Sequence, residues 1–502
     1  MMTICKILFY IWKNKKTFTL VKNLHLGSCM RKILHEQLEL GEIDISLVKI
    51  DLLSRDELPQ LLLGFQQIYM NHGLFTKISS VLTHLIPSHI DCTTGRSGMH
   101  LWRIFVLGSL RLCCNWDYDK VQEIANNHHT LRQILGHSSL DFSTRYSRQS
   151  LCDNLRLFTV EILDEINQLV VDFGLEKFGK SPLTARCDSF VVETDVHFPT
   201  DINLLWDAIS KVLLLTHRLS QATCIPGWRQ SMHNLKVIKR LYRKVQNSRR
   251  HKKSADHCLH DTQVYIDRVY PFLVAAWNVA RDFEHTPLHG KIAKEIMRFV
   301  CHGERQIDQI YRRCIRGETI LHNEKVFSLF EEHTEWIIKG KTGVTQELGL
   351  AVSIVESAEG FILHHQVLQK QTDAECAVRI TADTKKRYKQ LHQCSYDKGF
   401  YSPDNHQDLK KILKQPILPQ KGKANKQQIE FEKSVLFKTA RRQHAAVESA
   451  IHALENHGLD RCPDKGVDGF KRYIGLAIVA RNIQILGCKI MKQKKRALKK
   501  VA

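Results

Sequence analysis

The chain has 502 residues, 43% of them apolar, and a formal net charge of +22. The apolar fraction is that of a soluble globular protein, and the length exceeds what one hydrophobic core supports, so we expect two or three domains. The positive charge favours a polyanionic partner, nucleic acid above all, although a ribosome-like or merely soluble basic protein would share it.

The cysteines and the N-terminus argue against a secreted, disulfide-bonded protein. The fifteen cysteines are odd in number and contain no C-x-x-C pair, which predicts reduced thiols in a cytoplasmic, nucleoid-associated protein. Neither His257–His260 nor Cys301–His302 has the paired cysteines typical of a zinc site. Ile4–Trp12 is too short to span a membrane. We expect residues 1–29 to be a poorly ordered extension and Met30 to be the natural start.

Residues 30–170 have the apolar periodicity of helices and contain a candidate helix-turn-helix. One helix is expected from Tyr118, with Asp117 as its N-cap, and a second from Arg148 to Phe158. An ordinary helical subdomain is an alternative from the pattern alone. The polar side chains that would contact DNA are Arg145, Arg148, Gln149 and Arg156.

Residues 181–201 contain the stretch that organises the chain. Ala185–Asp195 is β-branched and aromatic and lies between Pro182 and Pro199, which predicts a buried strand. Asp188 on this strand is costly to bury unless it is paired or binds a metal, although a solvated or capping aspartate is an alternative. Thr200 or Asp201 is expected to cap the following helix, so Asp201 is interpreted as a cap and not as a metal ligand.

Residues 202–320 show helical patterns and almost no strand pattern, so we expect a helical insertion within the strand-containing domain. No acidic residue interrupts the basic stretch from position 236 to 253, which favours contacts with phosphates over a merely solvated face. The cations of this basic track are Lys236, Lys239, Arg240, Arg243, Lys244, Arg249, Arg250, Lys252 and Lys253.

Residues 321–487 return to strands and contain two more acids of interest. Strands are expected at 335–338, 348–355 and 361–368, then a helix near 374–388, a strand that ends at Asp397, a helix at 404–413 and a strand at 416–419. A later helix, His444–Leu454, carries Glu448. Asp188, Asp397 and Glu448 can supply the oxygen ligands for a pair of Mg²⁺ ions, with Mn²⁺ as a substitute.

Further cations surround these acids and end the chain. Residues 420–426 form a basic loop that we expect to be mobile, and residues 488–502 are expected to be a flexible basic tail. The candidate DNA contacts in this half of the chain are Lys398, Lys421, Lys423, Arg441 and Arg442.

Three segments resemble DDE insertion-sequence transposases of the ISNCY group. Cys187–Asp201 resembles the segment of the first catalytic aspartate, Tyr396–Phe400 that of the second, and Ala446–Cys462 the helix of the glutamate. The resemblance spans roughly residues 30 to 487 with the motifs in the family's order. It departs from related groups at His444 and Glu455, where an arginine and a lysine are often found, and Glu455 is therefore the main alternative to Glu448.

The resemblance implies a mixed α+β protein with an N-terminal all-α DNA-binding region and a ribonuclease-H-like α/β core interrupted by the helical insertion. It further implies a transposase that binds inverted repeats of double-stranded DNA, cuts them with Mg²⁺ and transfers strands to target DNA, as a multimer on DNA. Asp188, Asp397 and Glu448 would be both catalytic residues and metal ligands. A catalytically decayed repressor of the element is the alternative, and a nuclease that only hydrolyses is a third possibility.

Overall fold

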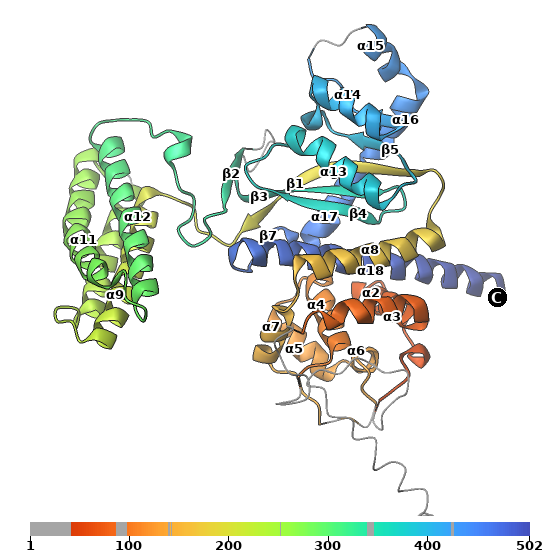
Figure 1. Ribbon diagram of the computed structural model, residues 1–502, viewed down its shortest axis with the longest axis horizontal. Coiled ribbons are helices and arrows are strands. Elements are labelled where there is room, and N and C mark those ends of the chain that lie inside the picture. The colour runs from red at the N-terminus through yellow and green to blue at the C-terminus, as the bar shows by residue number, and fades with distance from the viewer. Residues whose placement is uncertain are drawn as a thin grey trace, which may run out of the picture. The chain divides into compact units, whose positions relative to one another are not determined.

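The computed structural model describes residues 42–86, 98–138, 141, 143–251, 253–338, 346–422 and 426–501. The protein is mixed α+β, as predicted, with helices and a mixed seven-stranded sheet (Figure 1). Its Cα positions group into two units. Unit 1 contains the chain up to Val192, Ala351–Asp464 and the chain from Asp468, and unit 2 contains Glu193–Leu350 and Lys465–Val467.

Unit 1 begins with short helices. Asp117 caps α5 at its start, as predicted, by accepting a hydrogen bond from the Lys120 amide. The helix that begins at Arg148 ends at Leu155 and not at Phe158, because Phe158 is buried against Gly108 of α4. The short helix α6, between the two expected helices, was not predicted. The bounds are η1 Ile45–Leu47, α2 Glu57–Met70, α3 His72–Thr83, α4 Leu101–Cys113, α5 Tyr118–Asn127, α6 His129–Ile134, α7 Arg148–Leu155 and α8 Val160–Phe178.

The sheet has the strand order β2-β3-β1-β5-β6, with β4 beside β3 and β7 beside β1. β1 runs parallel to β5 and β5 parallel to β6, whereas β3 is antiparallel to β2 and to β4. The predicted strands are present to within about two residues at most ends. The bounds are β1 Leu183–Thr194, β2 Glu335–Ile338, β3 Gln346–Ser357, β4 Ile362–Leu368, β5 Leu391–Tyr396, β6 Gln415–Ile417 and β7 Arg461–Cys462.

Helices α8 and α18 (Gly466–Val501) are joined to the sheet by two buried asparagines. The side-chain amides of Asn167 and Asn482 both donate to the carbonyl of Ile362, and Asn482 Oδ1 accepts from the Ile362 amide. Helix α2 lies so close to α18 that a Cβ on Gly487 would stand 1.8 Å from the Gln60 carbonyl oxygen. Helix α18 therefore joins the N-terminal helices to the sheet within unit 1 (Figure 1).

The prediction of a flexible basic tail from residue 488 onwards is wrong, because helix α18 continues to Val501. By length and composition, Gly466–Lys500 could cross a membrane, yet 83% of its most apolar window is buried inside the protein. The apolar face is covered by α2, α4 and α8, so this helix is part of the core of unit 1.

The remaining helices of unit 1 follow β4. They are α13 Asp373–Arg387, η3 Lys398–Phe400, α14 Pro403–Ile412, α15 Lys426–Lys433, α16 Val435–His444, α17 Ala446–Leu454 and the π-helical turn η4 Glu455–Leu459. Part of the basic loop predicted at 420–426 lies outside the described residues. The helices α15 and α16 between that loop and the glutamate helix were not predicted.

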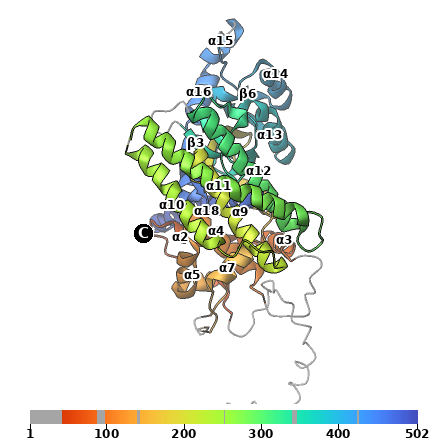
Figure 2. The same cartoon turned by 90° about the vertical axis from the view of Figure 1, so that its left-hand side faces the viewer.

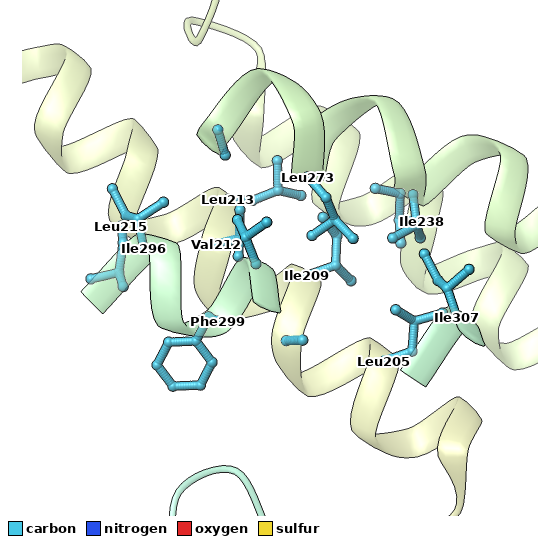
Figure 3. Packing of buried hydrophobic residues seen from close by; sticks show 14 of the residues in the cluster. Leu205, Ile209, Val212, Leu213, Leu215, Ile238, Leu273, Ile296, Phe299 and Ile307 are labelled. Carbon is cyan, nitrogen blue, oxygen red and sulfur yellow. The ribbon is translucent and has the colours of Figure 1, made fainter. Parts of the chain in front are cut away.

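Unit 2 is built around a helical bundle, α9 Asp201–Thr223, α10 Ser231–Arg250, α11 Ala255–Phe283 and α12 Gly290–Cys314 (Figure 2). Thr200 caps α9 by accepting from the Asn203 amide, and Asp201 is the first helical residue. Apolar side chains of all four helices meet in one cluster, among them Leu205, Ile238, Leu273 and Phe299 (Figure 3). Apolar burial of this kind is the main stabilising term of a bundle.

Candidate active site

The register of β1 and β5 brings the first two predicted acids together. The strands run in parallel and Cys187 is paired with Tyr396. Asp188 and Asp397 are the next residues on each strand, and Asp397 lies just beyond the end of β5. Adjacent parallel strands are about 4.8 Å apart, so the two carboxylates belong to one local cluster.

Helices α16 and α17 bring Glu448 to the same region. Arg441 of α16 donates from Nη1 to the Tyr396 carbonyl at 2.9 Å, and His444 Nδ1 lies 3.0 Å from Ser395 Oγ. Arg186 of β1 donates to the carbonyl of Gln443 at 3.0 Å. These bonds attach the end of α16 to the strands that carry the aspartates, and Glu448 follows in the first turn of α17.

Charge repulsion and burial act together on Asp188. Its pKa is raised to about 6, first because the carboxyl group is largely buried and then because Asp397, Asp373 and Glu448 are negatively charged neighbours. A hydrogen bond from the Ser189 amide opposes the shift. The three predicted acids therefore interact electrostatically, and a cation among them would relieve the repulsion.

Asp373 is a fourth acid of this cluster and was not predicted. It is the first residue of α13, whose start is fixed by a capping box between Thr372 and Glu375. Burial raises the pKa of Asp373, a hydrogen bond from the Ser189 side chain lowers it, and the charge of Asp397 raises it. The T-x-x-E pattern is visible in the sequence and could have located this helix start. The proximity to Asp188 depends on the tertiary structure.

The carboxylates of Asp188, Asp397 and Glu448 are neighbours, but their oxygens do not all lie close enough to one another to bind one ion. Among the described residues, Glu57, Cys113 and Cys114 are the one group of potential metal ligands whose ligand atoms all lie within 4.8 Å of one another. The oxygens of Asp188, Asp397 and Glu448 would have to approach one another to share an ion. A cation lies beside one of these acids, because Arg441 Nη2 is 3.8 Å from Asp397 Oδ1.

The alternative acids have other contacts. Glu455 lies 3.8 Å from His452 Nδ1 and is not among the charges that shift the pKa of Asp188. Asp195 lies 3.6 Å from Lys465 Nζ, and Asp201 is paired with Arg313 at 3.0 Å. These positions favour Glu448 over Glu455 as the third member of the cluster.

The predicted contacts of the helix-turn-helix are all exposed to solvent. Helices α5 and α7 pack against each other and are joined by an ion pair of 3.3 Å between Asp119 and Arg148. Gln149 donates to Asp153, and Arg145 donates to the Asn126 carbonyl. Arg156 follows the end of α7 and is exposed. The polar face that would meet a phosphate backbone is therefore accessible.

The basic track lies mostly on α10. Its exposed cations there are Lys236, Lys239, Arg240, Arg243, Lys244, Arg249 and Arg250. Lys244 Nζ lies 2.8 Å from Asp261 of α11, which neutralises its charge. The basic track itself contains no acid, so only the fold brings this acid close to it. Lys239 lies over the Trp206 ring. Lys253 is described and exposed, whereas Lys252 lies outside the described residues.

The described members of the other predicted DNA contacts lie on the segments that follow β5 and β6 and on α16. Lys398 and Arg442 are exposed, Arg441 is half-buried, and Lys421 is exposed in the loop after β6. Lys423 lies outside the described residues, as does Gly340–Gly343, which lacks the spacing of a phosphate loop. In the His257–His260 stretch, which lacks the pattern of a zinc site, His257 Nε2 lies 3.4 Å from Asp261.

No protein-family model, no curated protein and no solved structure matches the chain.

Proposed function

We propose that this protein is a DDE transposase that binds the inverted repeats of its insertion sequence and catalyses Mg²⁺-dependent DNA cleavage and strand transfer. The observation that carries the proposal is the cluster of acids around Asp188. One carboxyl group is largely buried, its pKa is raised to about 6, and Asp397, Asp373 and Glu448 add to the shift. Perturbed carboxylates that converge from distant parts of a chain are typical of catalytic sites.

The order of elements supports a ribonuclease-H-like core. After β1, the chain has the strands β2, β3 and β4, then α13, β5, α14 and β6, and then the helix of Glu448. This is the order expected from the resemblance. The parallel pair of β1 and β5 carries the two aspartates at adjacent positions, where parallel strands commonly present functional side chains.

The donor chemistry of the cluster suits Mg²⁺. Asp188, Asp397 and Glu448 offer only carboxylate oxygens, which hard divalent cations prefer, and Asp373 is a further oxygen donor. Bound Mg²⁺ supplies charge neutralisation at a phosphodiester and acidifies water for hydrolysis. The three predicted acids would hold the ions, and Asp188, at the centre of the cluster, would contribute the carboxylate that is most costly to ionise without them.

The cations of the chain would hold the DNA. Arg441 is anchored by its bond to the Tyr396 carbonyl and is oriented beside Asp397, where it can contact a phosphate. Lys398 follows Asp397 directly and is exposed. The exposed cations of α7 and α10 would neutralise phosphates of the DNA backbone, which gives a salt-dependent contribution to affinity.

The test is a cleavage assay on DNA that carries the inverted repeats flanking the gene. With Mg²⁺ we expect nicks at the repeat ends, 3′-OH termini, and joined products when target DNA is added. EDTA should abolish all three signals.

Three outcomes separate the candidate functions. Cleavage with joining supports the transposase. Cleavage without joining identifies a hydrolytic nuclease, and repeat binding without cleavage in Mg²⁺ or Mn²⁺ identifies a repressor. Asp188→Asn is the matched control, because it removes one ionisable oxygen without changing the size of the side chain.

A further inference from the structure

A second cluster of potential metal ligands lies in unit 1, on elements that carry none of the predicted catalytic acids. It combines Glu57 in the first turn of α2 with Cys113 and Cys114 at the end of α4. Their ligand atoms all lie within 4.8 Å of one another. Cys113 is fully buried, Cys114 is half-buried, and both are free thiols.

A histidine from the turn η4 lies beside Glu57, outside the group of three whose ligand atoms are all within 4.8 Å of one another. His457 Nε2 lies 3.4 Å from Glu57 Oε1, and the His457 side chain is only 2% exposed. Its Nδ1 atom is buried and has no hydrogen-bond partner. The two nitrogens point in different directions from the imidazole ring, so Nε2, the nitrogen beside Glu57, is the atom that would bind a shared ion, and Nδ1 would be left to donate a hydrogen bond.

The backbone is shaped to bring η4 against the end of α4. Asn115, directly after the two cysteines, and Gly458, directly after the histidine, have φ values of 49° and 92°. A Cβ on Gly458 would stand 2.9 Å from Asn115 Oδ1 and 2.8 Å from Tyr473 Oη. Only glycine permits this approach, which holds His457 next to the turn that follows Cys113 and Cys114.

We propose that Cys113, Cys114, His457 and Glu57 bind one Zn²⁺ ion. Two sulfur donors, one imidazole and one carboxylate form a four-coordinate set that suits zinc and does not suit Mg²⁺. Ligand atoms in a tetrahedral zinc site are about 3.3 to 3.8 Å apart, so small side-chain rotations suffice for Glu57, Cys113 and Cys114, whereas His457 must turn towards the thiols to complete the set.

The charge balance of the site is favourable. Binding breaks the two S–H bonds and forms two Zn–S bonds, and the two protons pass to solvent. Two thiolates, one carboxylate and Zn²⁺ then have a net charge of about −1. Arg481 of α18 is the cation that acts on both Glu57 and Cys113, and its charge compensates this excess.

The ion would tie three distant parts of unit 1 together. Helices α2 and α4 come from the N-terminal half, and η4 directly follows the helix that carries Glu448. A ligand that binds only the folded state stabilises it. The zinc site would thus have a structural role, separate from the oxygen-only acids around Asp188.

The test uses the full-length chain, purified under reducing conditions. We expect about one zinc ion per chain by mass spectrometry after gel filtration. Replacement by Co²⁺ should give a thiolate-to-cobalt charge-transfer band in the near ultraviolet, and excess Mg²⁺ should not remove it. Cys114→Ser and His457→Asn should each weaken zinc binding at least about tenfold.

Cys152→Ser, a half-buried cysteine on α7, is the control and should retain the zinc and the cobalt band. Glu57→Gln, at a partly exposed position, provides a variant with little risk to folding, and circular dichroism verifies the fold of each protein. A wild-type chain without bound zinc and without the cobalt band would overturn the proposal. So would wild-type stoichiometry and band intensity in Cys114→Ser and His457→Asn.

Discussion

Two aspartates, one buried in unit 2 and one half-buried in unit 1, have opposite electrostatic surroundings. In the bundle of unit 2, Asp261 is 2% exposed and is contacted by Lys244 at 2.8 Å and by the Ser248 hydroxyl. These contacts lower the pKa of Asp261 well below its usual range, the Lys244 bond first. In unit 1, Asp188 has three acidic neighbours, and its pKa is raised to about 6.

The difference separates a structural acid from a candidate functional one. The charge of Asp261 is balanced by its ion pair with Lys244, so this charge contributes to the stability of α10 and α11. The neighbours of Asp188 are themselves acids and do not balance its charge. Ionising its carboxyl group therefore costs free energy unless a cation is bound. An acid without a compensating partner departs from the usual rule for charged groups in proteins, and such departures are typical of functional sites.

The largest expected effect is the loss of chemistry in Asp188→Asn. We expect DNA cleavage to fall by at least about 1,000-fold, because the neutral amide cannot hold a divalent cation as a carboxylate does. Binding to the inverted repeats, measured by gel shift, should remain. Asp195→Asn is the control with an intact cluster. Cleavage retained in Asp188→Asn would move the catalytic role to Asp195 or Asp201.

The next effect is a loss of stability in Asp261→Asn. We expect the free energy of unfolding at pH 7.5 to fall by roughly 2 to 3 kcal/mol, because the variant removes the charge that pairs with Lys244 and turns one of the two oxygens that accept from Lys244 and Ser248 into a donor. Urea denaturation measures the change. Asp267→Asn, on the same helix, should cost less than about 0.5 kcal/mol. An unchanged midpoint in Asp261→Asn would show that the buried pair is not stabilising.

Asp188→Asn is expected to raise the free energy of unfolding, whereas Asp261→Asn is expected to lower it. The carboxyl group of Asp188 ionises near pH 6 in the folded chain and at its ordinary, lower pKa in the unfolded chain. The contribution of Asp188 to stability therefore decreases as the pH rises from about 4 to 6 and does not recover above that range. At pH 8 we expect Asp188→Asn to be more stable than wild type by about 1 to 3 kcal/mol.

Denaturation curves at pH 4 and pH 8 decide this prediction. The gain should be present at pH 8 and should largely vanish at pH 4, where Asp188 is protonated in both states. Added Mg²⁺ should raise the melting temperature of wild type and leave that of Asp188→Asn nearly unchanged. A variant that is less stable than wild type at pH 8 would contradict the assignment of Asp188 as an uncompensated acid.

The smallest effect concerns the exposed face of α10. We expect Arg240→Ala with Arg243→Ala to weaken DNA binding about tenfold at moderate salt and to reduce the slope of log K against log salt by about 2. Lys294→Ala with Arg281→Ala removes the same charge from α12 and α11 and serves as the control. Equal losses in both double variants would mean that net charge, and not the α10 face, determines the affinity.

Much of the secondary structure was predictable because it depends on local patterns. The strand that contains Asp188, with its β-branched residues after the aspartate, the N-cap at Asp117 and the strand just before Asp397 are present as expected. The end of the helix at Leu155 and the helical conformation after residue 488 were not predicted. Burial of Phe158 ends the first helix, and the continuous helix α18 overrides the basic composition of the second segment.

The candidate sites show the same division. Asp188, Asp397 and Glu448 could be selected one by one from the sequence, because each lies in a recognisable strand or helix. Asp373 could not, since nothing in its own segment indicates that α13 begins beside β1. The cluster of Glu57, Cys113, Cys114 and His457 could not either, because its members lie up to 400 positions apart along the chain.

The sequence by itself determined which segments form strands and helices and which residues are able to hold a cation. The tertiary structure alone decided which of those residues are neighbours and which are already paired, as Asp261 is with Lys244. The physical reason is that hydrophobic periodicity acts over a few residues of chain, whereas the interaction between charges depends on their separation in space and on burial. The raised pKa of Asp188 is a property of that spatial arrangement.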